Sequence, residues 1–498
     1  ETQSPTGGRE INTYYAAAGE TGCPASPSGF VHFLKSKSVI PSPAFSAAPS
    51  TRIEHTYADL PSLQGSSKRF LVLLSDELYE VGTAEPLVRT TYRYVRDPTQ
   101  TQYGKVSGRT DTVGGAATTY THTYTQAQGC LHVSQSVEAG GHSSMQQAWY
   151  DELSGQEVKV CDHDQSLLES TYDGLGRLKC ETVASPTHPA SRQYAYHLPN
   201  DAEGEARHTI VNSRGAQHAT TFDGLGRKVH VAMQDLDHPG TEKPMREVYR
   251  AVYTASGQLS EEFTTDWFEG VAHTVRTGFS YDDWGNVSQV TGPDGTVTHE
   301  LHDPVTRTHT QWIEGAGQTV TVNNDFAKPA SVERIDTQGH SLGKTLFTYD
   351  GLGRCLETLS PPGLLNQFSY DVFGRLTKSV LPDGTVITRL YSAHSIGPYP
   401  TQIKANDYVL GTRTYDAFMR ISSTTVGGRT ERFTYERGRG EPSSKTCASG
   451  KIIHFTLDPV CKGEVARRSV EGYSDLTTTF NPASPHDALL QASNPYSQ

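Results

Sequence analysis

Residues 348–354 read TYDGLGR, and close copies of this heptapeptide recur along the chain. Self-similarity at a regular spacing is the sequence signature of a repeat architecture, so these copies decide the fold. The other copies are TYDGLGR at 171–177, TFDGLGR at 221–227, SYDVFGR at 369–375, SYDDWGN at 280–286 and TYDAFMR at 414–420.

The residue types within 348–354 predict a β-hairpin. A Thr-Tyr pair suits the end of a half-buried strand. Asp350 can bond the backbone two residues further on and start an Asx-turn. We expect Gly351 and Gly353 to supply the positive φ of a tight reversal. Arg354 then leads into a returning strand.

The spacing of the copies predicts two reversals in each repeat. Tyr349, Tyr370 and Tyr391 follow one another at steps of 21 residues. Asp294 and Asp383, both in Pro-Asp-Gly sequences, lie 13 residues after a repeat tyrosine. Pro followed by Asp-Gly is turn chemistry. Each repeat therefore contains two strands of about 5–8 residues, and the predicted fold class is all-β with very little helix.

The YDGLGR and PDGT elements resemble the YD repeats of the Rhs family over about residues 150–440. That family includes the B and C components of bacterial Tc insecticidal toxin complexes, Rhs polymorphic toxins and animal teneurins. The resemblance implies antiparallel β-hairpins that wind as a spiral sheet into part of a hollow shell. In Tc and Rhs toxins such a shell encloses a cytotoxic polypeptide.

The predicted site residues are structural and belong to the repeat itself. They are Tyr172, Asp173, Gly176, Arg177, Phe222, Asp223, Gly226, Arg227, Tyr281, Asp282, Gly285, Tyr349, Asp350, Gly353, Arg354, Tyr370, Asp371, Gly374, Arg375, Tyr415 and Asp416.

Three regions are predicted along the chain. Residues 1–149 form an N-terminal β region with degenerate repeats and a loop-rich start, with strands expected near 12–16, 69–74, 87–95 and 118–126. Residues 150–440 form the repeat array, interrupted by an irregular insertion at 235–244. Residues 441–498 hold a degenerate last repeat at 457–463 and a polar, proline-rich tail.

Composition argues against several classes of protein. A net charge of −12 without a strong basic stripe is unlike a general nucleic-acid binder. The most apolar run, 70–74, is far shorter than the ~18–20 residues of a membrane span. Seven scattered cysteines without a CxxC pair predict mostly free thiols, although Cys447 and Cys461 could pair. No signal peptide is visible, and the missing initial Met suggests a fragment or a processed chain.

The search for chemistry predicts no catalytic, cofactor or metal residues. The repeat aspartates are interpreted as turn formers. The run 141–145 (GHSSM) lacks the final glycine of a hydrolase elbow. The cluster 161–164 (CDHD) is interpreted as a solvated turn, because adjacent strand residues point to opposite faces. The family's Asp-Pro-x-Gly core motif has no convincing copy, since Asp303-Pro304 and Asp458-Pro459 lie in decayed repeats.

The leading hypothesis is a structural shell segment of a Tc- or Rhs-type toxin, which is not an enzyme and has no cofactor. The alternative is a cell-surface adhesin whose tyrosines bind carbohydrate or a receptor. A hidden enzyme in 1–100 or 440–498 is a third, weaker hypothesis. The resemblance implies a secreted protein whose partners are the remaining YD-repeat shell, from the same chain or a B or C subunit, and an enclosed toxic C-terminal domain. A translocation pore or secretion-system component would be a further partner. We expect neither nucleic-acid binding nor direct membrane insertion.

Overall fold

The computed structural model describes residues 1–26, 29–30, 32–62, 69–163, 167–184, 190–199, 205–213, 215–236, 238, 240–436, 438–457, 465–480 and 489–493. These residues contain strands, turns and loops but no helix, so the prediction of an all-β chain is confirmed. No helix of the described residues is long and apolar enough to cross a membrane.

The strands are numbered in chain order. The first are β1 (Thr2–Gln3), β2 (Arg9–Tyr14), β3 (Leu34–Ile40), β4 (Thr51–Pro61), β5 (Arg69–Glu80), β6 (Val88–Tyr94), β7 (Val106–Val113), β8 (Ala116–Ala127), β9 (Cys130–Ala139), β10 (His142–Asp151), β11 (Glu157–Cys161), β12 (Leu167–Tyr172) and β13 (Leu178–Ala184). Next are β14 (Ala190–His197), β15 (Ala206–Val211), β16 (Gln217–Phe222), β17 (Lys228–Gln234), β18 (Met245–Tyr253), β19 (Leu259–Phe268), β20 (Val271–Tyr281), β21 (Val287–Thr291), β22 (Val297–Asp303), β23 (Thr308–Ile313), β24 (Gln318–Asn323), β25 (Pro329–Ile335) and β26 (Ser341–Tyr349). The last are β27 (Cys355–Leu359), β28 (Leu365–Tyr370), β29 (Leu376–Val380), β30 (Val386–Tyr391), β31 (Pro400–Ala405), β32 (Tyr408–Tyr415), β33 (Ile421–Val426), β34 (Arg429–Tyr435), β35 (Pro442–Thr446), β36 (Ile452–Leu457), β37 (Val465–Val470), β38 (Leu476–Phe480) and β39 (Leu489–Ser493).

All 39 strands belong to one antiparallel sheet, in which each strand pairs with its neighbours in sequence. The result is a long ribbon of hairpins that is not closed into a barrel. Neighbouring strands of a twisted sheet are rotated relative to one another, so a ribbon of this length must curl. The predicted strands at 69–74, 87–95 and 118–126 correspond to β5, β6 and β8, and the strand expected near 12–16 lies slightly earlier, as β2.

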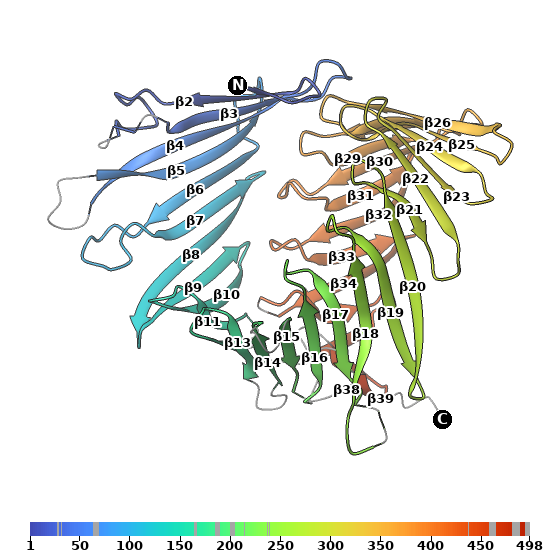
Figure 1. The fold of residues 1–498 in the computed structure, drawn as a ribbon. Coiled ribbons are helices and arrows are strands. Elements are labelled where there is room, and N and C mark those ends of the chain that lie inside the picture. The colour runs from blue at the N-terminus through green and yellow to red at the C-terminus, as the bar shows by residue number, and fades with distance from the viewer. Residues whose placement is uncertain are drawn as a thin grey trace.

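The ribbon winds through more than one turn of a spiral (Figure 1). Strands β2 to β10 form one side, β13 to β17 form the bottom and β18 to β26 rise on the other side. Strands β29 to β34 then pass behind and descend again, so the chain begins a second coil. Below, the first coil means β3 to β25 and the second coil means β26 to β38.

The ribbon is one layer thick and has little conventional core. Ten hydrophobic residues of the described chain fall in the buried class, among them Leu60, Val231 and Tyr349. Most strand residues are half-buried on both faces, as expected for a single curved sheet with 35% hydrophobic residues in the chain.

Some of the sequence predictions fall outside the described residues, and the structure does not test the division into three regions. The degenerate repeat predicted at 457–463 and the tail at 481–498 are mostly outside them, as is Cys461. The other six cysteines are free thiols. Strand pairing continues without interruption across residues 150 and 440, so the division into three regions stays a prediction.

Candidate functional site

The ribbon has turns along both of its edges. Turns that follow odd-numbered strands lie on one edge, and turns that follow even-numbered strands lie on the other. The second edge includes all the YD heptapeptides, and we call it the YD edge. Tyr172, Phe222, Tyr281, Tyr349, Tyr370 and Tyr415 each end an even-numbered strand, directly before such a turn. The chemistry of these turns explains how the ribbon is held together.

The aspartate closes each YD turn through its carboxylate. In Asp350, Oδ1 accepts the backbone N–H groups of Leu352 and Arg354, both at 2.9 Å, and Oδ2 accepts Arg354 Nε at 2.6 Å. This is an Asx-turn closed by a charge-assisted bond. The same three bonds recur at Asp173, Asp223, Asp371 and Asp416.

The pKa values of two of these carboxyls follow from the same bonds. The hydrogen bonds from the backbone N–H and guanidinium of Arg177 hold the pKa of Asp173 below its usual value. At Asp223 the guanidinium of Arg227 is the main cause of the lowered pKa. In the copy at Asp282 the arginine is replaced by Asn286, whose Nδ2 donates to Asp282 Oδ2 at 3.1 Å.

The two glycines of the heptapeptide have different roles. Gly353 has a φ of 75°, in the left-handed region that favours glycine. The equivalent glycines also have positive φ, with 79° at Gly176, 75° at Gly226, 86° at Gly285 and 80° at Gly374. The expectation that Gly351 also has positive φ is wrong, because its backbone is not left-handed. A Cβ on Gly351 would lie 2.6 Å from the carbonyl oxygen of Ser42, so this position is small because another segment packs against it.

The repeat tyrosines extend the ladder beyond its last backbone pair. Tyr370 ends β28 and donates its hydroxyl to the carbonyl of Cys355, the first residue of β27, at 3.0 Å. Burial raises the pKa of Tyr370, as expected for a hydroxyl held away from water. Phe222 stands at the same position without a hydroxyl. Equivalent bonds run from Tyr172 to Glu157, Tyr253 to Lys228, Tyr281 to Leu259, Tyr349 to Pro329, Tyr391 to Leu376, Tyr415 to Pro400 and Tyr435 to Ile421.

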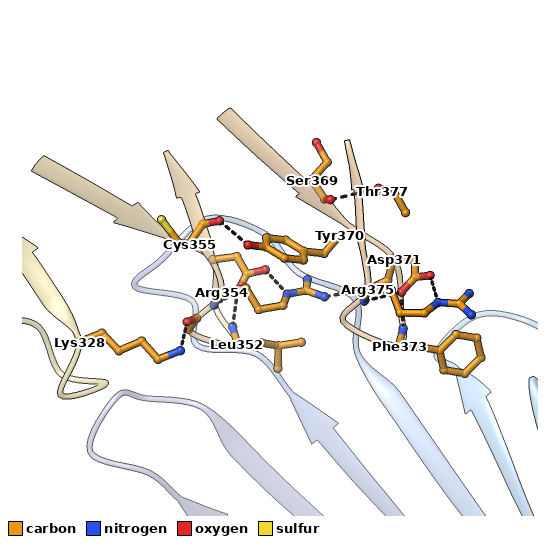
Figure 2. A network of polar contacts seen from close by, with 12 residues as sticks. Lys328, Leu352, Arg354, Cys355, Ser369, Tyr370, Asp371, Phe373, Arg375 and Thr377 are labelled. Carbon is orange, nitrogen blue, oxygen red and sulfur yellow. Dashed lines mark hydrogen bonds and ion pairs between the residues drawn. The ribbon is translucent and has the colours of Figure 1, made fainter. Parts of the chain in front are cut away.

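The arginine joins its own turn to the next one (Figure 2). Arg354 Nη1 donates to the carbonyl oxygen of Asp371 at 2.9 Å, and its guanidinium lies over the ring of Tyr370 at 5.2 Å. Such a cation–π contact stabilises by about 0.5–1 kcal/mol where it is exposed. The same stacking joins Arg177 to Tyr196, Arg227 to Tyr253, Arg375 to Tyr391 and Arg420 to Tyr435. Sequence reasoning missed these links, although the recurrence of Tyr and Arg at fixed positions was their signal.

The two coils meet at a seam formed by their turns. The loop 41–50, between β3 and β4, lies against the YD turn at 349–351. Ser42 N–H donates to the carbonyl of Gly351 at 2.8 Å, and Gly351 N–H donates to the carbonyl of Ser46 at 2.8 Å. Asp350 is only 1% exposed under this loop. The same loop also reaches the last turn of the first coil, where Phe45 packs on Phe326, between β24 and β25, with ring centroids 4.7 Å apart.

The seam continues along both coils in the same order. A Cβ on Gly140, in the β9–β10 turn, would lie 2.6 Å from the Cβ of Ala417. A Cβ on Gly438 would lie 2.9 Å from the Cβ of His163, which follows β11. Between these points and the loop 41–50, the β7–β8 turn at Gly114 meets the backbone of Ala393. Since residue numbers rise together on both sides, the second coil runs in the same direction as the first, as a spiral requires.

The YD turns at 173–177, 223–227 and 282–286 of the first coil carry no such cover. Leu175, Leu225 and Trp284 occupy the position that Leu352 holds in its heptapeptide. They are 73%, 77% and 74% exposed, whereas Leu352, in the seam, is 37% exposed. We call these three side chains the exposed tips. They show that the YD edge of the first coil is open at these three turns.

Among the described residues, one cluster of possible metal ligands lies on β22 and β23. Glu300, His302 and His309 bring their ligand atoms within 4.8 Å of one another, and sequence reasoning missed this set. The predicted turn at 161–164 lies partly outside the described residues.

Comparison with known proteins gives structural neighbours only. No protein-family model matches the chain, and no curated protein matches it. Among solved structures, the TcdB2-TccC3-Cdc42 crystal structure has 10% identity and a TM-score of 0.39, covering 91% of this chain and 38% of that chain. The TcdB2-TccC3 crystal structure has 11% identity and a TM-score of 0.36, covering 96% and 45%. A Photorhabdus luminescens Tc holotoxin pore has 12% identity and a TM-score of 0.36, covering 90% and 27%. The chain thus spans less than half the length of these neighbours.

Proposed function

We propose that this chain is a wall segment of a hollow protein shell that encloses and delivers a cytotoxic polypeptide. The observation that carries the proposal is the seam between the coils. Turns of the first coil pack on YD turns of the second, with Asp350 buried beneath the loop 41–50. A ribbon that closes sideways on itself makes a continuous wall, which a container needs and an adhesin does not.

The construction of the ribbon also favours a wall over an enzyme. The recurring polar groups of the YD turns, such as those of Asp350, Arg354 and Tyr370, form bonds within the ribbon. Carboxylates and hydroxyls that are already bonded to backbone and guanidinium groups are structural rather than reactive. The resemblance of the heptapeptides to YD repeats also supports a structural wall.

The open YD edge of the first coil indicates the partner that such a wall would have. Gly351 shows that a YD turn accepts a loop by exchanging backbone hydrogen bonds with it. The exposed tips Leu175, Leu225 and Trp284 would be covered in the same manner by turns of further YD-repeat shell. That shell would come from the same protein or from a B- or C-type subunit, in a secreted complex that also contains a toxic C-terminal domain and is emptied through a pore or secretion component.

Limited proteolysis of the complete assembly tests the proposal. The assembly, purified with the polypeptide it contains, is treated with protease and then denatured, and the surviving fragments are identified by mass spectrometry. We expect the enclosed polypeptide to survive while exposed loops of the wall, such as 152–155, are cut. The same polypeptide released by urea serves as the control and should be digested. Digestion at equal rates before and after release would refute the container and leave the adhesin as the better hypothesis, which binding to a glycan array would then examine.

A further inference from the structure

The hairpin of β22 and β23 departs from the repeat at one place. His302 occupies the position of the repeat tyrosine, directly before Asp303. In the copy at 349–354, the pairing shifts at the turn, so that Tyr349 pairs with Cys355. In β22 and β23 the pairing runs to the strand end without a shift, and His302 lies directly opposite His309.

The register places a third ligand on the same face. Glu300 lies two residues before His302, and alternate residues of a strand share a face. Glu300 pairs with Gln311, whose Nε2 donates to Glu300 Oε1 at 3.5 Å. That contact leaves Oε2 to face the two imidazoles. The rings of His302 and His309 stack with centroids 4.2 Å apart and planes 7° apart.

The distances from the carboxylate to the two imidazoles fit a transition-metal ion. Glu300 Oε2 lies 3.4 Å from His302 Nε2 and 3.5 Å from His309 Nε2. Bonds of about 2.0–2.1 Å around a tetrahedral Zn²⁺ place its ligand atoms about 3.3–3.4 Å apart. His309 Nε2 is also a buried atom without a hydrogen-bond partner. A buried polar atom without a partner is costly, and a metal ion would satisfy it.

The site has room for a fourth ligand. His302 and His309 line an open cleft of about 650 Å³, together with Trp284 and Asn286. The two rings are about one third exposed, and binding a common ion requires them to turn from their parallel arrangement toward it. Two histidines, one carboxylate and water form a ligand set that Zn²⁺ accepts.

We propose that Glu300, His302 and His309 bind one divalent zinc-class ion, with water as the fourth ligand. The ion would join β22 to β23 beside the exposed tip Trp284. The alternative is a site without metal, in which protonated histidines form ion pairs with Glu300. Gln311 is a positioning residue that holds the other carboxylate oxygen.

Zinc binding to the purified, chelator-treated chain tests the proposal. We expect isothermal titration with ZnCl₂ to show one site that is absent from the His302→Gln/His309→Gln double variant. Gln311→Ala should weaken the site by about tenfold, the lower end of the effect of outer-shell partners. The matched control is His299→Gln, because His299 lies on the same strand but stacks on Trp312 on the opposite face.

Two readouts separate this site from the free cysteines and from misfolding. Co²⁺ bound at a site with nitrogen and oxygen ligands gives d–d absorption without the charge-transfer band of thiolate ligands. Zn²⁺ should raise the melting temperature of the wild type and of His299→Gln but leave that of the double variant unchanged. Equal Zn²⁺ stoichiometry and equal thermal shifts in the wild type and a folded double variant would refute the site. A Co²⁺ spectrum dominated by thiolate charge transfer would also refute it.

Discussion

The backbone N–H of Ser42 donates to the carbonyl of Gly351 at 2.8 Å, which joins a loop of the first coil to a YD turn of the second. Gly351 returns a hydrogen bond of the same length to Ser46. The seam therefore uses the same kind of bond that pairs strands within the ribbon. It converts a hairpin ribbon, which alone would be open on both edges, into a wall.

The first prediction concerns the first glycine of the heptapeptide. Gly351→Ala should destabilise the chain by about 1–3 kcal/mol, the usual cost of overpacking, because its Cβ would meet Ser42 O at 2.6 Å and Pro41 Cβ at 2.7 Å. Gly174→Ala is the matched control, since Gly174 holds the same position with nothing within 4 Å of a Cβ. Urea unfolding should show a lower midpoint for Gly351→Ala alone. Equal midpoints would contradict the seam.

The second prediction concerns the second glycine. Gly226→Val should cost about 1–3 kcal/mol through backbone strain, because Gly226 has a φ of 75° and open space around its Cβ position. Gly224→Val, two residues earlier, is the control, because its φ is not left-handed and its surroundings are equally open. Thermal melts of both variants measure the difference. An unchanged Gly226→Val variant would show that the turn does not require glycine.

The third prediction concerns the tyrosine hydroxyl. Tyr370→Phe should lose about 0.5–1.5 kcal/mol, because the carbonyl of Cys355 loses a hydrogen bond at a half-buried position. Tyr408→Phe, at an exposed tyrosine, should change stability by less than about 0.5 kcal/mol. Denaturant midpoints of the two variants check this. Equal effects of the two substitutions would mean that the hydroxyl bond contributes nothing specific.

The fourth prediction concerns alkaline pH. Burial raises the pKa of Tyr349, Tyr370 and Tyr435 above the ordinary value, and it is the main cause that raises the pKa of Tyr194 to about 12. The folded chain therefore holds these protons more tightly than the unfolded chain. Their contribution to stability is complete below about pH 10 and is lost as the pH rises through the folded values. Ultraviolet titration should show later tyrosine ionisation in the folded chain than in urea, whereas coincident curves would contradict the burial.

Much of the ribbon could be predicted from the sequence because its causes are local. The left-handed conformation of Gly226 and Gly353 follows from turn chemistry within a few residues. The role of Gly351 could not be predicted, because it depends on a loop hundreds of residues earlier in the chain. The pair of His302 and His309 also needed the register of β22 and β23, since a shift of one residue would place them on opposite faces.

The exposed tips provide the fifth prediction. Replacing Leu175, Leu225 and Trp284 by Ser should leave the stability of the separate chain nearly unchanged, because these side chains are mostly exposed. The same substitutions should weaken assembly with the remaining shell, measured by size-exclusion chromatography with light scattering. Leu352→Ser, in the covered seam, should instead destabilise the separate chain. Normal assembly of the triple variant would show that the open YD edge is not where the shell continues.

An electron cryomicroscopy map of the complete assembly tests the central claim most directly. The account predicts a closed wall in which turns of further hairpins cover Leu175, Leu225 and Trp284, as the loop 41–50 covers Asp350. It also predicts density for a polypeptide inside the wall. A map in which these three side chains face solvent, and in which the wall surrounds no polypeptide, would contradict the container.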